Sequence, residues 1–133
     1  MPAIRPAFRL ICLLWFCVGI PAQAEMRLGA NGHPLVSYHG VTLERQLDLL
    51  QDLGLTSYRV DIRELGQADA LVKLVSLAKA RGIEILPVIT PAFDLDRKEP
   101  ADLYRESYEL AVALVSRFNS DIRVWELGNE MEN

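Results

Sequence analysis

Cysteine and histidine are scarce in this chain of 133 residues. The cysteines are Cys12 and Cys17, both close to the start, and the histidines are His33 and His39. Both cysteines lie within residues 1–24. If these residues are removed, no thiol remains for a disulfide or a thiolate metal site. Two histidines alone support a tight zinc site poorly. The fold must therefore be stabilised by packing, and we expect no metal.

A net positive charge and glycine-rich phosphate loops are also lacking. Lys and Arg number 14 against 18 Asp and Glu, a formal net charge of -4. Affinity for phosphate backbones requires a basic surface, so nucleic acid is not an expected partner. No strand-like run leads into a dinucleotide fingerprint or a Lys-Ser/Thr phosphate loop, so nucleotide binding loses its usual support. Half of the residues are hydrophobic and 24% are charged, which indicates one modest folded domain at most.

Residues 1–24 have the pattern of a secretory signal peptide. Two arginines precede an apolar run over 10–20, and residues 22–24 form the small-residue cleavage pattern Ala-Gln-Ala. The apolar run is about half of the roughly 20 residues that a membrane-spanning helix needs. We therefore expect cleavage, a mature domain over 25–133 that is free of the membrane, and a secreted or periplasmic location.

The mature chain alternates strand-like runs with amphipathic helix-like stretches. This alternation predicts an α/β fold of parallel strands joined by helical crossovers. The strands are expected at 26–30, 57–62, 83–89 and 122–127, and the helices at 42–53, 67–81 and 101–118. Pro87 is awkward in the third strand, because proline cannot donate a ladder hydrogen bond. Tyr104 and Tyr108 fall on the apolar stripe of the third helix and are expected in its core.

Polar residues follow or end each predicted strand. Functional side chains of parallel α/β sheets gather at the carboxyl ends of the strands, so these residues are the candidate site. They are Asn31, His33, Arg59, Asp61, Arg63, Thr90, Glu126, Asn129, Glu130 and Glu132.

The strongest motif is Val-Trp-Glu-Leu-Gly-Asn-Glu at 124–130, which places an Asn-Glu pair just past a hydrophobic strand. This motif resembles retaining glycoside hydrolases of clan A, and family 39 and its relatives in particular. The resemblance implies that Glu130 is the general acid/base. It also implies that Asn129 hydrogen-bonds the sugar hydroxyl next to the reacting carbon, and that the protein needs no cofactor.

The resemblance covers nearly all of the mature chain. Tyr-Arg-Val-Asp at 58–61 is similar to the second strand of these barrels, where an Arg positions a catalytic carboxylate, which implies that role for Arg59. Gly-Ile-Glu-Ile-Leu-Pro-Val-Ile at 82–89 is similar to their third strand. The first strand is a looser match, with Asn31 and His33 as candidate substrate contacts. The implied fold is the first four βα units of a (β/α)8 barrel.

Retaining hydrolysis needs an acid/base and a second carboxylate about 5 Å away as nucleophile. In the resembled families the nucleophile sits on the seventh strand, and a whole barrel takes about 250 residues. We therefore expect the amino-terminal half of an exported enzyme acting on a polysaccharide or glycoside, inactive alone, with open edges that favour self-association. The sequence does not indicate which sugar or linkage is cleaved.

Less specific interpretations remain for several residues. Arg59 could pair with Asp61 or Glu130 as structural charge compensation. Glu126 is expected to be a structural hydrogen-bonding residue inside the barrel, and His33 is open to being an ordinary surface residue. For the whole chain, the alternatives are a non-catalytic carbohydrate-binding or interaction module of the same fold, closed by dimerisation, and an unrelated α/β periplasmic domain.

Overall fold

The computed structural model describes residues 27–35, 38, 40–92 and 98–128. The elements are β1 (Gly29–Gly32), α1 (Leu43–Asp52), β2 (Ser57–Ile62), a 3-10 turn η1 (Leu65–Gln67), α2 (Ala68–Lys79), β3 (Glu84–Ile89), α3 (Pro100–Phe118) and β4 (Glu126–Leu127). The segment expected to be a signal peptide lies outside the described residues. Within the described ranges, no helix combines the length and the apolar character that crossing a bilayer requires.

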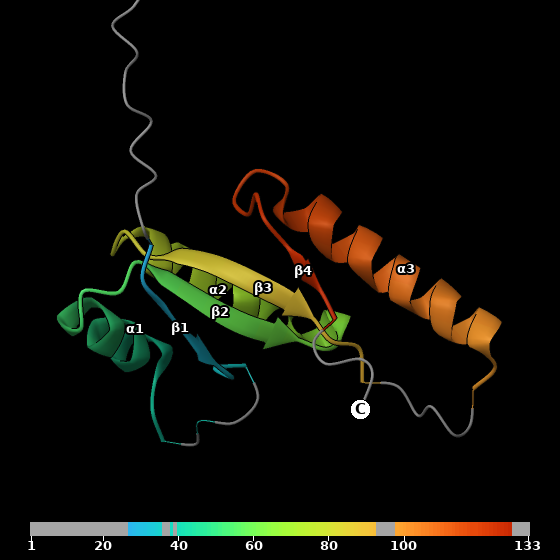
Figure 1. The fold of residues 1–133 in the computed structure, drawn as a ribbon, viewed down its shortest axis with the longest axis horizontal. Coiled ribbons are helices and arrows are strands. Elements are labelled where there is room, and N and C mark those ends of the chain that lie inside the picture. The colour runs from blue at the N-terminus through green and yellow to red at the C-terminus, as the bar shows by residue number, and fades with distance from the viewer. Residues whose placement is uncertain (1–26, 36–37, 39, 93–97, 129–133) are drawn as a thin grey trace, which may run out of the picture.

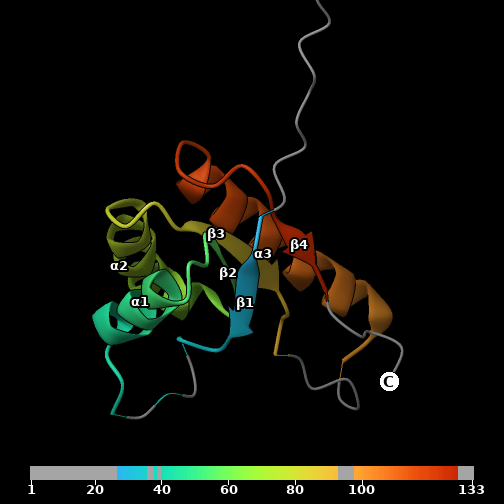
Figure 2. The same cartoon turned by 60° about the vertical axis from the view of Figure 1, so that its left-hand side comes forward.

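The four strands form one parallel sheet in the order β1-β2-β3-β4 (Figures 1 and 2). Each strand pairs with the next one along the chain, so every crossover steps in the same direction across the sheet. The predicted α/β class with parallel strands and helical crossovers is therefore confirmed. The second strand has the predicted bounds, 57–62, and the third begins one residue later than predicted.

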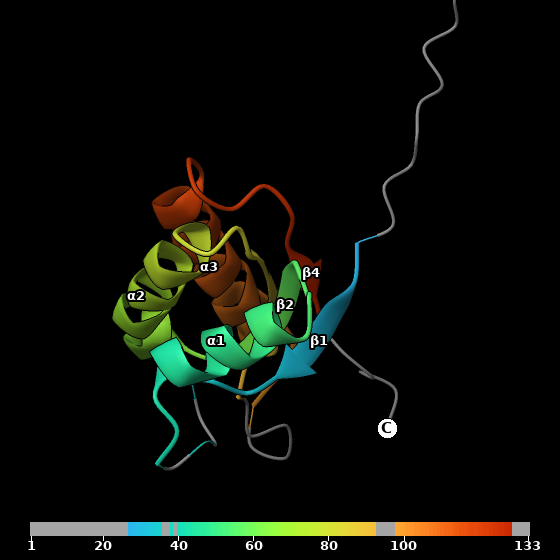
Figure 3. The same cartoon turned by 90° about the vertical axis from the view of Figure 1, so that its left-hand side faces the viewer.

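In the part of the chain that the structure describes, the helices cover one face of the sheet and none lies on the other (Figure 3). On β2, the buried side chains of Tyr58, Val60 and Ile62 belong to the core under the helices. Side chains alternate across a strand, so Arg59 and Asp61 lie on the opposite face. We call this second face the open face.

Helix boundaries follow the expected local signals. Thr42 is the N-cap of α1, and its Oγ1 accepts a hydrogen bond from the Arg45 backbone N at 3.2 Å. Gly54, just beyond α1, has φ = 70°, a left-handed conformation that glycine adopts without steric cost. Neighbouring helices are also linked by charge, since Lys73 of α2 pairs with Glu44 of α1 at 3.0 Å.

Pro87 explains why β4 is shorter than predicted. Backbone N–H groups of Glu84 and Thr90 donate toward β2, so even-numbered residues of β3 face β2 and odd-numbered ones face β4. Pro87 has no backbone N–H, and its nitrogen faces β4. The missing hydrogen bond therefore affects pairing with β4, whereas the β2–β3 ladder continues past Pro87. The β3–β4 ladder begins just after it, at Val88 opposite Glu126. The strand predicted over 122–127 is thus reduced to its last two residues.

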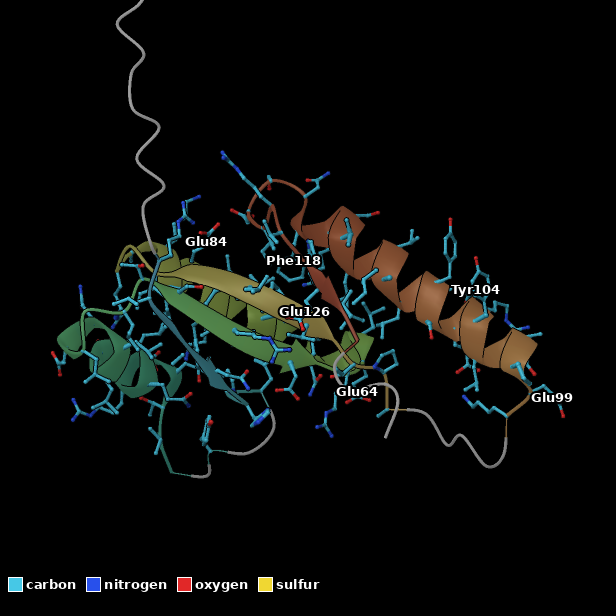
Figure 4. The ribbon with its side chains drawn as sticks, viewed as in Figure 1. Glu64, Glu84, Glu99, Tyr104, Phe118 and Glu126 are labelled. Carbon is cyan, nitrogen blue, oxygen red and sulfur yellow. The ribbon has the colours of Figure 1, made fainter. Side chains whose placement is uncertain are left out.

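The apolar stripe predicted for α3 is buried only in part, and the prediction that Tyr104 and Tyr108 lie in the core is wrong. Tyr104 and Tyr108 are 73% and 60% exposed, and Tyr104 projects away from the sheet in Figure 4. The helix buries Leu114 and Phe118, and Trp125 packs edge-on against Phe118 with 6.1 Å between ring centroids. The reason is that α3 lies beside the outer strand β4, and among the described residues no further element covers these two rings.

Two adjacent residues of α2 test the core directly. Leu71 is fully buried, whereas Val72 is 44% exposed. We expect Leu71→Ala to lower the free energy of unfolding by about 2–5 kcal/mol, because it leaves a cavity between α2 and the sheet. Val72→Ala should change it by less than about 0.5 kcal/mol. Urea denaturation of the two variants checks this, and equal effects would contradict the core as described.

Candidate functional site

Polar side chains concentrate on the open face toward the carboxyl ends of the strands. The register places Asn31, Arg59 and Leu86 side by side, and one step further along Asp61, Val88 and Glu126. Val88 is only 1% exposed although no helix covers this face, so the side chains around it must bury it. In Figure 4, Glu126 lies over the sheet on the side that faces away from α2.

Arg59 is the centre of the first cluster, which joins three strands. Its Nε donates to Glu126 Oε2 at 2.8 Å and its Nη2 donates to Glu126 Oε1 at 2.6 Å. Its Nη1 donates to Asn31 Oδ1 at 3.1 Å. Two parallel bonds between a guanidinium and a carboxylate fix both groups in one plane. Asn31 and Arg59, which the resemblance associated with substrate, are therefore in direct contact.

The pKa of Glu126 is lowered below the ordinary value of a glutamate. The largest cause is its hydrogen bonding to Arg59, and the charge of Arg59 acts in the same direction. A carboxyl with a lowered pKa is a poor general acid at neutral pH. This geometry favours a positioning role for Glu126, in line with the structural role expected from the sequence.

A second cluster surrounds Asp61, whose side chain is 9% exposed. Its Oδ1 lies 2.6 Å from His33 Nδ1, and its Oδ2 accepts a bond from Arg63 Nε at 3.2 Å. The His33 backbone N donates to Tyr38 Oη at 3.2 Å, which ties the end of β1 to the loop that follows. The sequence assigned no clear role to Asp61. Its position two residues after Arg59 could have indicated that it belongs to the site, because residues two apart lie on the same face of a strand.

Beneath these clusters, Tyr58 connects the sheet to α1. Its hydroxyl donates to Gln46 Oε1 at 3.0 Å, and both residues are buried. Burial, followed by the nearby Tyr38 and Asp61, raises the pKa of Tyr58 to about 12. The phenol therefore remains a hydrogen-bond donor at any pH at which the protein would be assayed.

The described residues end at Gly128, inside the motif at 124–130. Gly128 has φ = 76°, and its backbone N donates to Ile89 O at 2.9 Å, so pairing with β3 extends to this residue. Asn129 and Glu130, the implied sugar-binding and acid/base residues, lie outside the described residues. Their roles stay predictions.

Hollows among the described residues lie away from these clusters. One of about 510 Å³ opens at the amino ends of the strands, between Arg27, Glu84 and Arg123. Ligand sites of parallel sheets form at the opposite end, so we give this hollow no functional weight. A second hollow, of about 330 Å³ and mostly apolar, lies between Tyr104, Tyr108 and Leu127. Metal-binding clusters of three or more His, Cys, Asp or Glu are absent from the described part of the chain.

Comparison with known proteins gives no assignment: no protein-family model matches the sequence, and no curated protein matches it.

The close approach of Gly32 to Tyr58 gives a test of how tightly β1 packs against Tyr58 beneath the site. A Cβ at Gly32 would lie 2.4 Å from Tyr58 Oη and 2.8 Å from Cε2 of a buried ring. We expect Gly32→Ala to destabilise the chain by about 1–3 kcal/mol through overpacking. Gly66→Ala is the control, because the nearest atom to its Cβ is a Glu64 carboxylate oxygen at 3.7 Å. Urea denaturation should separate the two variants, and equal stability would contradict the close packing of β1 on Tyr58.

The Arg59–Glu126 pair makes a second prediction, about pH. Because the folded-state pKa of Glu126 is lowered, its stabilising contribution is present above the unfolded value of about 4.3 and is lost as the pH falls through the folded value. Carboxyl ¹³C NMR titration should show the pKa of Glu126 rising in Arg59→Gln. Arg123→Gln, a charge loss three residues from Glu126, should leave it unchanged. A Glu126 pKa insensitive to Arg59→Gln would refute the bidentate pair.

Proposed function

We propose that this chain supplies the first four βα units of an exported retaining glycoside hydrolase with a (β/α)8 barrel. Glu130 is its general acid/base, and Asn129, Arg59, Asn31 and His33 bind or position the substrate. The enzyme cleaves an O-glycosidic bond of a polysaccharide or glycoside.

The observation that carries this proposal is the Arg59 cluster on the open face. In a barrel the helix-free face of the sheet turns inward, and catalytic side chains project at the carboxyl ends of its strands. Arg59, Asn31 and Glu126 meet on that face at that end. The Asn-Glu pair of the motif follows Glu126 by three and four residues along the same chain.

The different surroundings of the carboxyl groups also support the proposal. A glycosidase acid/base must protonate the leaving sugar oxygen and later deprotonate water, which requires a pKa near neutrality. Glu126 does not meet this requirement, because Arg59 keeps its pKa low. Asp61 is engaged by His33 and Arg63. Glu130 therefore remains the candidate acid in the motif, and the nucleophile is expected from a later strand.

The uncovered side of α3 is consistent with further βα units. Each of the first two helices packs against the next one, as the ion pairs Glu44–Lys73 and Asp69–Arg117 show. The edge of α3 that borders β4 carries exposed Tyr104 and Tyr108, and the mostly apolar hollow lies between these rings and Leu127. A fourth helix in the same series would cover these rings, and fifth and later strands would extend the sheet beyond β4.

The first test is on the gene. Translation of the DNA that follows the Asn133 codon should give four more βα units with a Glu at the end of the seventh strand. If no barrel-like sequence follows in any frame, the proposal fails. A non-catalytic carbohydrate-binding module, closed by self-association, then becomes the better explanation.

The second test is on the encoded enzyme. We expect Glu130→Gln to reduce kcat/KM on unactivated oligosaccharides by about 10²–10⁴-fold, because proton donation to the leaving group is lost. The loss should be much smaller on dinitrophenyl glycosides, whose leaving group needs no proton, and azide should then yield a glycosyl azide of retained configuration.

Glu109→Gln is the matched control, since it makes the same change at an exposed position of α3 and should leave kcat/KM within about threefold. Equal losses in the two variants would contradict the assignment of Glu130. The 133-residue chain alone should not turn over these substrates, and turnover by it would contradict a nucleophile on a later strand.

A further inference from the structure

The cluster around Asp61 is separate from the Arg59–Glu126 pair, and it holds a histidine by one ring nitrogen. His33 Nδ1 lies 2.6 Å from Asp61 Oδ1. The side chain of His33 is 48% exposed, whereas that of Asp61 is 9% exposed. Across the described residues, Nε2 of His33 has no hydrogen-bond partner. The imidazole is thus held on one side by a buried carboxylate and is accessible to solvent or a ligand on the other.

The chemistry of this contact determines which nitrogen carries the proton. A carboxylate is only an acceptor, so Nδ1 must be the donor in a contact of this length. In the neutral imidazole the other nitrogen, Nε2, is then an acceptor. Arg63 Nε donates to the remaining oxygen, Oδ2, at 3.2 Å, which keeps the carboxylate turned toward His33.

The position of the pair places it beside the proposed site. Asp61 lies in register with Val88 and Glu126, and His33 follows β1 directly after Gly32, which is opposite Val60. His33 and Asp61 therefore continue the pairing of β1 with β2 one step past Asn31 and Arg59, toward the carboxyl ends. A ligand over Arg59 and Glu126 would meet His33 at the β1 side.

We propose that Asp61 is a positioning residue that fixes His33 in the Nδ1–H tautomer and so presents Nε2 as an acceptor for a ligand hydroxyl. The identity of that ligand as a sugar rests on the proposed function. The tautomer does not, because it follows from contacts within the chain. Failure of the hydrolase proposal would leave the tautomer unchanged.

Long-range ¹H–¹⁵N NMR of the ¹⁵N-histidine-labelled chain tests this, since the two ring nitrogens report separately whether they are protonated. The spectra are recorded near pH 8, above the ordinary imidazole pKa of about 6.5. With only His33 and His39 in the chain, His39→Gln assigns the signals. We expect a protonated Nδ1 and an unprotonated Nε2 for His33. A protonated Nε2, alone or together with Nδ1, overturns the proposal.

Asp61→Asn separates a positioning role from a merely structural one. Arg63 Nε is a donor, so the new amide should turn its oxygen to Arg63 and its NH2 to His33 Nδ1. The tautomer should then switch to Nε2–H, as in a catalytic triad whose Asp is replaced by Asn. Arg63→Gln keeps the carboxylate and should not switch it. An unchanged tautomer in folded Asp61→Asn overturns the proposal, and if that variant does not fold, the wild-type spectrum still decides.

Discussion

Burial of one face of the parallel sheet is the constraint on which the rest of the structure depends. The helices α1, α2 and α3 all lie on that face, and the alternate residues of β2 that point to it, Tyr58, Val60 and Ile62, are buried there. Because side chains alternate between the two faces of a strand, Arg59 and Asp61 must then lie on the other face. A one-residue slip of β2 would bury an arginine and an aspartate under the helices, so the same apolar pattern that stabilises the fold also determines where its polar chemistry lies.

Much of this could be predicted from the sequence because the signals were local. Thr42 and Gly54 bound the first helix, and the bounds of β2 follow from its run of β-forming residues between turn signals. Arg59 and Asn31 were predicted at the site from strand ends and resemblance, and they are in contact. Their partner Glu126 was expected to be structural, but its pairing with Arg59 was not predicted, because it joins strands whose register no local pattern specifies.

The predictions failed where the outcome depends on what covers an element. Tyr104 and Tyr108 have the spacing of a buried stripe, but α3 lies beside the outer strand β4 and the described chain places no further element over these two rings. Periodicity reports that a face is apolar, not that a neighbour is present to bury it. The shortening of β4 had a readable cause, since Pro87 lacks an N–H on one side of its strand. Which side it faces depends on the register of β3 with β2, and this only the structure shows.

The open face distributes its charges so that each carboxylate has a defined cationic partner. Asp61 and Glu126 stand in one row across the sheet with Val88 between them, but Glu126 binds Arg59 and Asp61 binds Arg63 and His33. With separate partners, Glu126 is kept ionised and in one plane with Arg59, while Asp61 orients an imidazole. Two acidic groups of the same row can therefore support different hydrogen-bonding roles.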